Sequence, residues 1–224
     1  MSTLQAKAPE PSETQQQTRV LQLAAWLLSV VVSGLAVFVW GHDNGWQIFS
    51  FNAYQFFPVL GLLAFSLMWT HYVMGAAREL AKLPKSVLAQ WFRYTGYVVL
   101  VAICLHPGLL IYQRFRDGYG LPPGSYESYV AHGLGWITLL GTASLCVFLA
   151  FELHRFFRQK VWWHYVADSS DIAMLAIFYH SLRLGSQLMA DPWFRAIWWF
   201  YGLSLTAVLI RKYSLRLLAR KHAE

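Results

Sequence analysis

Cysteine and charge are both scarce in this sequence of 224 residues. Its two cysteines, Cys104 and Cys146, lie inside apolar runs, and neither has a partner at a metal-ligand spacing such as C-x-x-C. Cysteine in such surroundings is usually a small apolar residue, so neither a disulfide nor a metal role is expected. Charged residues make up 13% of the chain and hydrophobic residues 57%. This composition leaves no room for a separate soluble domain and predicts a polytopic membrane protein.

Nucleotide-binding and targeting signatures are also missing. The chain has no G-x-G-x-x-G or other flavin or nicotinamide motif. Residues 1–18 are polar and rich in glutamine, and they lack the short apolar core and cleavage site of a signal peptide. We expect residues 1–18 to be a disordered tail, residues 19–215 to form the membrane domain, and residues 216–224 to be a basic tail.

Long apolar runs account for most of the remaining sequence. A membrane core about 30 Å thick requires about 20 mostly apolar residues in each helix. Six runs meet that length, and the connections between them are short. The sequence therefore predicts an all-α bundle of six transmembrane helices, at approximately 20–40, 54–75, 92–114, 129–153, 165–188 and 193–213.

Lysine and arginine are distributed unevenly between the two sides of these runs. If the amino terminus is cytoplasmic, only four of the 18 basic residues fall outside, which leaves 14 inside or in cytoplasmic connections. Positive side chains accumulate on the cytoplasmic side of short loops. Both termini are therefore expected in the cytoplasm, and the net charge of +7 reflects topology and anionic lipid, not a nucleic-acid surface.

Two histidines lie deep within predicted spans. His106 and His180 each stand 13 residues beyond the cytoplasmic ends of their helices, near Arg93 and Ala167. At 1.5 Å per residue, both imidazoles reach roughly 20 Å into the membrane on helices of the same direction. Two imidazoles at one depth are what a bis-histidine haem requires, since the iron takes one axial nitrogen from each side.

Small residues share the faces of these two histidines, which would leave space for a porphyrin. Small residues also mediate close helix packing in lipid, and intramembrane histidines also form hydrogen bonds between helices, so these alternatives stay open. The small residues are Ala176, Ala173 and Ser169 near His180, and Ala102, Thr95 and Gly96 near His106.

The remaining membrane histidines lie near span ends. His71, His154 and His164 fall on the inner side, where His71 could pair with His154 or with His164 to hold a second haem. Solvated histidine at the membrane edge is the alternative, especially for His154 in the charged stretch ELHRFFRQK. His132, at the outer end of the fourth span, is a candidate spare ligand, propionate contact or proton carrier.

The stretch RYTGYVVLVAICLHPGLLIY and the later HYVADSSDIAMLAIFYHSLRLG resemble the ferric reductase-like transmembrane domain. That superfamily has six helices, of which the third and fifth carry haem ligands. It includes NADPH oxidases, metalloreductases and bacterial quinol-dependent haem proteins that supply electrons to periplasmic partners. The resemblance covers about residues 54–190, and its most specific element is Arg-x-Thr-Gly followed by Leu-His-Pro.

The resemblance implies that His106 and His180 take the outer-haem ligand positions. The family's second histidine, about 13 residues earlier on each helix, falls near Arg93 and Ala167 here, and neither offers an imidazole. The chain thus looks like a one-haem version. Alternatively it recruits His71 with His154 or His164, similar to cytochrome b561, where four successive helices supply one ligand each.

These observations predict a b-type cytochrome, and the resemblance together with the compact loops implies a bacterial inner membrane. We expect one haem b, with a second as an open alternative, and an electron donor that is a quinol or a partner protein. The acceptor would lie at the outer face, and the chain could work alone or within a larger complex. Asp168 and Asp171 are candidate proton-handling groups, although DSSD is also good helix N-cap chemistry. A non-redox scaffold or accessory subunit is the alternative, and a transporter ranks third.

Overall fold

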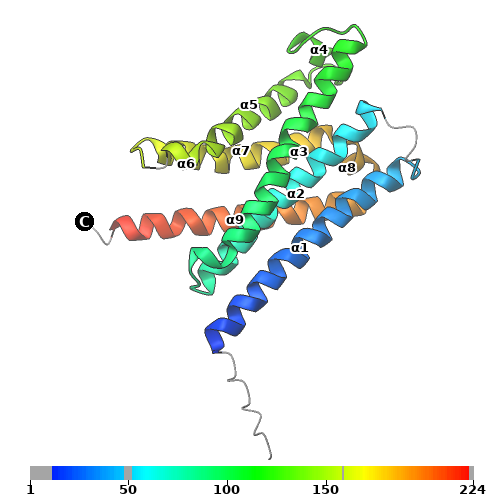
Figure 1. The fold of residues 1–224 in the computed structure, drawn as a ribbon. Coiled ribbons are helices and arrows are strands. Elements are labelled where there is room, and N and C mark those ends of the chain that lie inside the picture. The colour runs from blue at the N-terminus through cyan, green and yellow to red at the C-terminus, as the bar shows by residue number, and fades with distance from the viewer. Residues whose placement is uncertain (1–11, 48–51, 158, 222–224) are drawn as a thin grey trace, which may run out of the picture.

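The computed structural model describes residues 12–47, 52–157 and 159–221, and these residues form helices and turns without a β-strand (Figure 1). The helices follow one another as α1 (Glu13–Asp43), α2 (Ala53–Leu80), η2 (Lys85–Leu88), α3 (Ala89–Arg116), α4 (Gly124–Glu127), α5 (Gly135–Glu152), α6 (His154–Phe157), α7 (Trp163–Leu184), α8 (Ser186–Ala190) and α9 (Pro192–Lys221). The predicted all-α class is confirmed.

Five of these helices are long and apolar enough to cross a membrane: α1, α2, α3 with its preceding η2 turn, α5 and α9. The chain therefore has the makeup of an integral membrane protein. The predicted fifth span does form a helix, α7, of 22 residues. It is not among the five, because histidine, serine and aspartate in WHYVADSSD lower the hydropathy of its first half.

The ends of α1 and α9 differ from the predicted tails. Ser12 accepts a hydrogen bond from the backbone of Gln15, whose side chain in turn accepts one from the backbone of Ser12. This capping box starts α1 at Glu13, so residues 13–18, predicted as tail, are helical. The rest of that tail, residues 1–11, lies outside the described residues. At the other end α9 continues to Lys221, so most of the basic segment is helical as well.

Two antiparallel helix pairs organise the structure, α2 with α3 and α5 with α7. Helix α2 packs along α3 on one side and α1 on the other, whereas α5 packs along α7. Helix α9 contacts both groups through α2 and α7, and Figure 1 shows it passing behind α3. Pro107 lies inside α3, which continues as an α-helix to Arg116. The two pairs therefore face one another across the region that holds the deep histidines.

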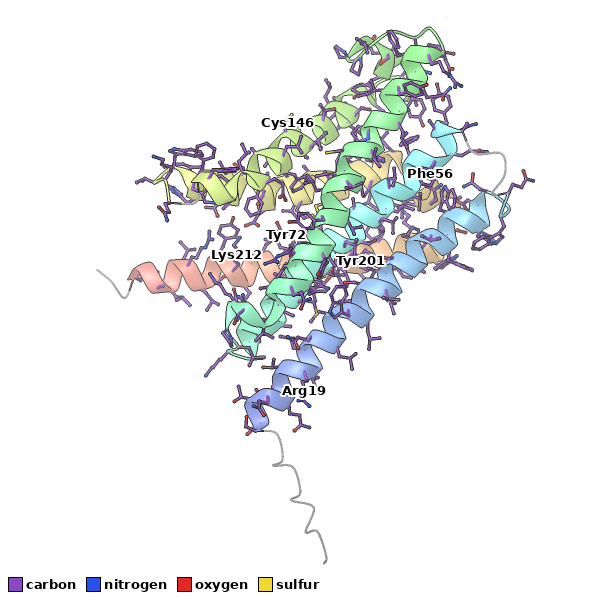
Figure 2. All side chains as sticks on the ribbon, viewed as in Figure 1. Arg19, Phe56, Tyr72, Cys146, Tyr201 and Lys212 are labelled. Atoms are coloured by element: carbon purple, nitrogen blue, oxygen red, sulfur yellow. The ribbon has the colours of Figure 1, made fainter. Side chains whose placement is uncertain are left out.

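Side chains on α2 and α9 form the largest part of the core. Trp69 is 4% exposed and Trp198 is completely buried, and each indole N–H donates to a serine hydroxyl, that of Ser204 and that of Ser181. In contrast, Cys104 and Cys146 are both exposed, as apolar cysteines facing lipid would be. Figure 2 shows Cys146 on the outer side of the bundle. The core thus fixes α9 against α2 and α7, next to His180.

Candidate functional site

A cavity of about 590 Å³ separates the two helix pairs, and both deep histidines line it. His106 reaches it from α3 and His180 from α7. The volume lies within the 300–1,000 Å³ that is usual for sites of small molecules and cofactors. The structure thus brings together the two residues that the sequence predicts at one membrane depth.

The ring of His106 is held by helix α2. Its Nδ1 lies 2.7 Å from the carbonyl oxygen of Phe57, so this nitrogen carries the proton and donates it. One helical turn later, Gly61 leaves room for the ring, because a Cβ built there would lie 2.7 Å from His106 Cε1. That distance is too short for any side chain. The absence of a side chain at Gly61 therefore decides where the imidazole sits.

The ring of His180 is held in the same way by helix α5. Its Nδ1 lies 2.8 Å from the carbonyl oxygen of Ile137, and the next turn of α5 carries Gly141. A Cβ at Gly141 would again lie 2.7 Å from the histidine Cε1. In both pairs, one residue supplies the carbonyl and the residue four positions later is the glycine that accommodates the ring.

This repeated arrangement determines which nitrogen of each ring is available. With the proton on Nδ1, Nε2 is a lone-pair donor. Neither Nε2 forms a hydrogen bond among the residues that the structure describes. Histidines that bind metals usually donate their second ring N–H to a carbonyl or carboxylate, which fixes the tautomer and raises the basicity of the ligating nitrogen. Both imidazoles therefore have an Nε2 lone pair that could bind a metal ion.

The cavity wall is mostly apolar, with polar groups toward one end. Leu62, Phe65 and Ile103 are among its apolar residues. Thr138, only 9% exposed, also lines it, and its hydroxyl oxygen is buried without a hydrogen-bond partner among the described residues. Polar side chains gather where α7 ends and α8 begins, near the start of α2: Tyr54, Tyr129, Arg183, Ser186 and Gln187.

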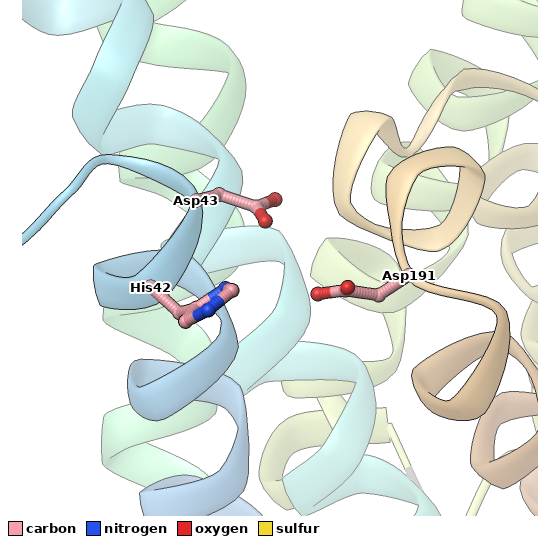
Figure 3. A group of neighbouring side chains, drawn as sticks. All are labelled: His42, Asp43 and Asp191. Carbon is pink, nitrogen blue, oxygen red and sulfur yellow. The ribbon is translucent and has the colours of Figure 1, made fainter.

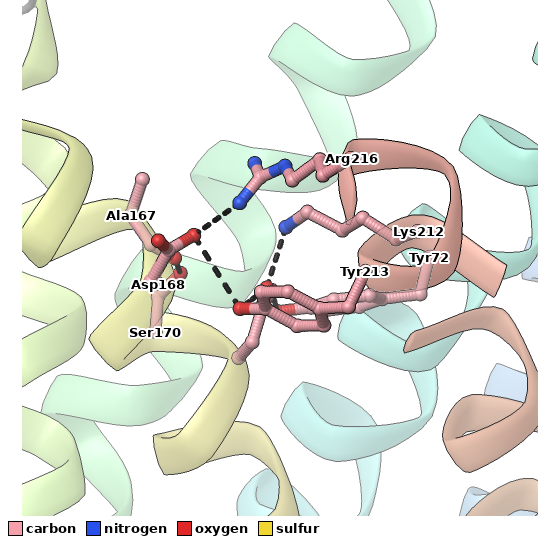
Figure 4. A network of polar contacts seen from close by, with 8 residues as sticks. Tyr72, Ala167, Asp168, Ser170, Lys212, Tyr213 and Arg216 are labelled. Carbon is pink, nitrogen blue, oxygen red and sulfur yellow. Dashed lines mark hydrogen bonds and ion pairs between the residues drawn. The ribbon is translucent and has the colours of Figure 1, made fainter. Parts of the chain in front are cut away.

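Asp168 and Asp171 belong to a polar network in the first half of α7, and Figure 4 shows Asp168 beside Lys212 and Arg216 of α9. Asp171 is 3% exposed, and one of its oxygens lies 2.5 Å from Lys212 Nζ and accepts from Tyr213 at 2.8 Å, while Tyr72 donates to the other at 3.0 Å. Asp168 pairs with Arg216 at 2.6 Å. The N-cap interpretation of DSSD is wrong, because α7 begins earlier, at Trp163. The two carboxylates instead attach α7 to α9 and α2.

His71, His132 and His164 are not among the described residues that line this cavity. The Nε2 of His71 lies 2.7 Å from Thr95 Oγ1, and its ring packs edge-on against Trp91 and Phe92. The Nδ1 of His164 lies 2.6 Å from the carbonyl oxygen of Val161 on an exposed turn. His132 is exposed just before α5. His154 begins α6, and its side chain lies outside the described residues.

Sequence reasoning missed the two glycines and the two carbonyl positions. The small residues predicted to make space lie on the helices that carry the histidines, whereas Gly61 and Gly141 lie on the neighbouring helices α2 and α5. A signal was available, because an isolated glycine within a helical apolar run costs stability and often marks a close approach.

Comparisons of the chain with protein-family models, with curated proteins and with solved structures gave no match.

Proposed function

We propose that this protein is a membrane-bound b-type cytochrome that holds one haem between His106 and His180 and passes electrons through it. The observation that carries the proposal is the pair of imidazoles in one cavity, each anchored through Nδ1 to a carbonyl of the neighbouring helix. A histidine that served only to connect helices would need no cavity at its second nitrogen.

The residues around the cavity suit a porphyrin in size and in polarity. Gly61 and Gly141 let each ring approach the adjoining helix closely, which leaves more of the space between the two helix pairs open. Apolar side chains such as Leu62, Phe65 and Ile103 offer the wall that an apolar macrocycle requires. Arg183, Tyr129 and Gln187 gather at one end, where they could bind the carboxylates of the macrocycle.

Each histidine has a defined task in this proposal. The Nδ1–H of His106 and of His180 donates to a carbonyl, which holds the ring orientation and makes Nε2 a stronger donor to iron. Haem, when bound, supplies a one-electron couple at its iron. Two basic imidazole ligands would favour a low-spin iron, and the apolar cavity wall would limit access of water to it.

The direction of electron flow follows from the predicted topology. With the amino terminus in the cytoplasm, as the lysine and arginine distribution favours, the polar end of the cavity faces outward. An outer acceptor would then approach near Tyr54, Tyr129 and Arg183. The donor is a quinol in the lipid or a partner protein, because the chain has no flavin or nicotinamide signature. The six-span count, with α7 as the fifth span, belongs to this proposal.

One haem is the better expectation than two. The Nε2 of His71, which the sequence offers as an inner ligand, is engaged by Thr95, and aromatic rings of α3 pack around the imidazole. A second haem would require His71 to leave this position.

Optical spectra of the purified protein test the proposal. We expect a low-spin b-type spectrum after reduction with dithionite, and we expect His106→Ala and His180→Ala each to abolish it. His132→Ala, which removes an exposed histidine outside the cavity, is the control and should leave the spectrum unchanged. A folded wild-type protein without haem, although haem was available during expression, would refute the cytochrome and favour a scaffold or accessory subunit.

A further inference from the structure

A second group of metal-ligand side chains lies away from the histidine cavity. His42, Asp43 and Asp191 each offer one ligand atom, and the three atoms lie within 4.8 Å of one another (Figure 3). His42 and Asp43 end helix α1, whereas Asp191 stands between α8 and α9. Two segments separated by about 150 residues along the chain therefore converge with one imidazole and two carboxylates.

The carboxylates in this group lack the partners that carboxylates usually have. Neither Asp43 nor Asp191 forms an ion pair with a lysine or arginine within the described part of the chain. The Oδ2 atom of Asp191 is buried and accepts no hydrogen bond from any described residue. A buried carboxylate oxygen without a donor costs free energy, and two neighbouring carboxylates repel each other. Both costs disappear when a cation binds between them.

Contacts from both segments hold Asp191 and His42 in place. The N–H of Asp191 donates to the carbonyl of Gln187, and the carbonyl of Asp191 accepts from the N–H of Arg195, so the residue is fixed between two helices. The ring of His42 stacks on that of Phe38 one turn earlier in α1. Figure 3 shows the Asp191 carboxylate directed across the gap toward the end of α1.

We propose that His42, Asp43 and Asp191 form a binding site for a divalent cation of the zinc type. One imidazole and two carboxylates suit Zn²⁺ better than Mg²⁺ or Ca²⁺, which prefer oxygen ligands alone. In a tetrahedral zinc site the ligand atoms lie roughly 3.3–3.6 Å apart, so closure from the present spacing requires side-chain shifts of about 1 Å. Three protein ligands leave one position for water or an external ligand.

The bound cation would also brace one wall of the histidine cavity. Helix α8 ends one residue before Asp191, and its residues Gln187 and Met189 line that cavity. A metal shared by α1 and Asp191 would fix α8 relative to α1. The site itself does not require haem, because none of its three ligands lines the histidine cavity.

Zinc binding to tag-free protein in a non-ionic detergent tests this site, by equilibrium dialysis with radioactive zinc and by the thermal unfolding midpoint. We expect one saturable Zn²⁺ per chain and a higher unfolding midpoint with zinc. His42→Ala and Asp191→Asn should each weaken binding by more than about 10–100-fold, the loss typical of removing only a supporting residue. His132→Ala and Glu127→Gln remove an exposed histidine and an exposed carboxylate elsewhere, and they should bind zinc as the wild type does.

Two further variants keep the result interpretable. Asp43→Asn should lose zinc as Asp191→Asn does, and elution as a single species in size-exclusion chromatography shows that each variant is folded. His106→Ala should bind zinc normally, so a failure of the haem proposal leaves this one standing, and the reverse also holds. Absence of saturable binding, or binding that survives both His42→Ala and Asp191→Asn, would overturn the site.

Discussion

Replacing Gly61 by alanine tests the packing on which the histidine site depends. A Cβ at this position would lie 2.7 Å from His106 Cε1 and 2.9 Å from Nδ1. Nonbonded carbon atoms pack at about 3.5–4.0 Å, so the imidazole must retreat by about 1 Å. That movement stretches the present 2.7 Å contact between Nδ1 and the Phe57 carbonyl beyond hydrogen-bond range.

Opposing free-energy contributions set how much Gly61→Ala changes the stability of the folded protein. Glycine to alanine within a helix favours folding by roughly 0.5–1 kcal/mol when the space is free. At Gly61, overpacking costs about 1–3 kcal/mol. The lost hydrogen bond between helices costs about 0.6 kcal/mol more. The matched control is Gly75→Ala, in the same helix α2, where a Cβ would meet nothing within 4 Å. We expect Gly61→Ala to be less stable than Gly75→Ala by about 2–4 kcal/mol.

Unfolding in mixed micelles, followed by circular dichroism, measures this difference. Gly141→Ala should repeat the result on the other helix pair, with Gly135→Ala as its control, because a Cβ at Gly135 also meets nothing. Both cavity variants should also lose haem, since the imidazole is displaced. If Gly61→Ala and Gly75→Ala unfold alike and carry equal haem, the close contact between glycine and imidazole has no role.

The remaining predictions concern the two ends of the bundle. Asp171→Asn should destabilise the protein by about 1–3 kcal/mol, because the Asp171 side chain is buried and Lys212 would lose its ion-pair partner. Asp168→Asn should cost less than about 1 kcal/mol, because the pair of Asp168 with Arg216 is more exposed. Chemical unfolding of both variants checks this order. At the opposite end, the Tyr54 hydroxyl donates to Asp117 at 2.7 Å and holds the pKa of that carboxyl below its ordinary value of 3.8. A carboxyl whose pKa is lowered by folding stabilises the folded state at pH values above its ordinary pKa. This contribution disappears as the pH falls through the lowered pKa. Tyr54→Phe should therefore weaken the loss of stability on acidification below about pH 4, and an unchanged acid profile would contradict the assignment.

The sequence was informative about the apolar helices and about which two histidines would line one cavity. Hydropathy located the apolar helices because lipid requires long uninterrupted runs. Equal distances of 13 residues along two helices predicted that His106 and His180 would meet, and both line one cavity. Depth can be read from one helix at a time, which is why this inference needed no knowledge of packing.

Contacts between helices were harder to predict. Asp168 and Asp171 resembled a helix start, because DSSD has the composition of an N-cap, but their partners on α9 are more than 40 residues away. Trp69 and Trp198 lie in predicted spans, and the packing of α2 with α9 buries both, which the sequence of a single helix does not reveal. Gly61 and Gly141 acquire meaning only when the neighbouring histidine is in place.

Haem content per folded chain tests the central proposal most directly. A pyridine haemochrome assay on detergent-purified protein, combined with a protein determination by amino-acid analysis, gives this ratio. We expect one haem b per chain, with a low-spin spectrum that requires both His106 and His180. A folded, monodisperse protein that contains no haem, or that retains haem when both histidines are replaced, would contradict the proposal.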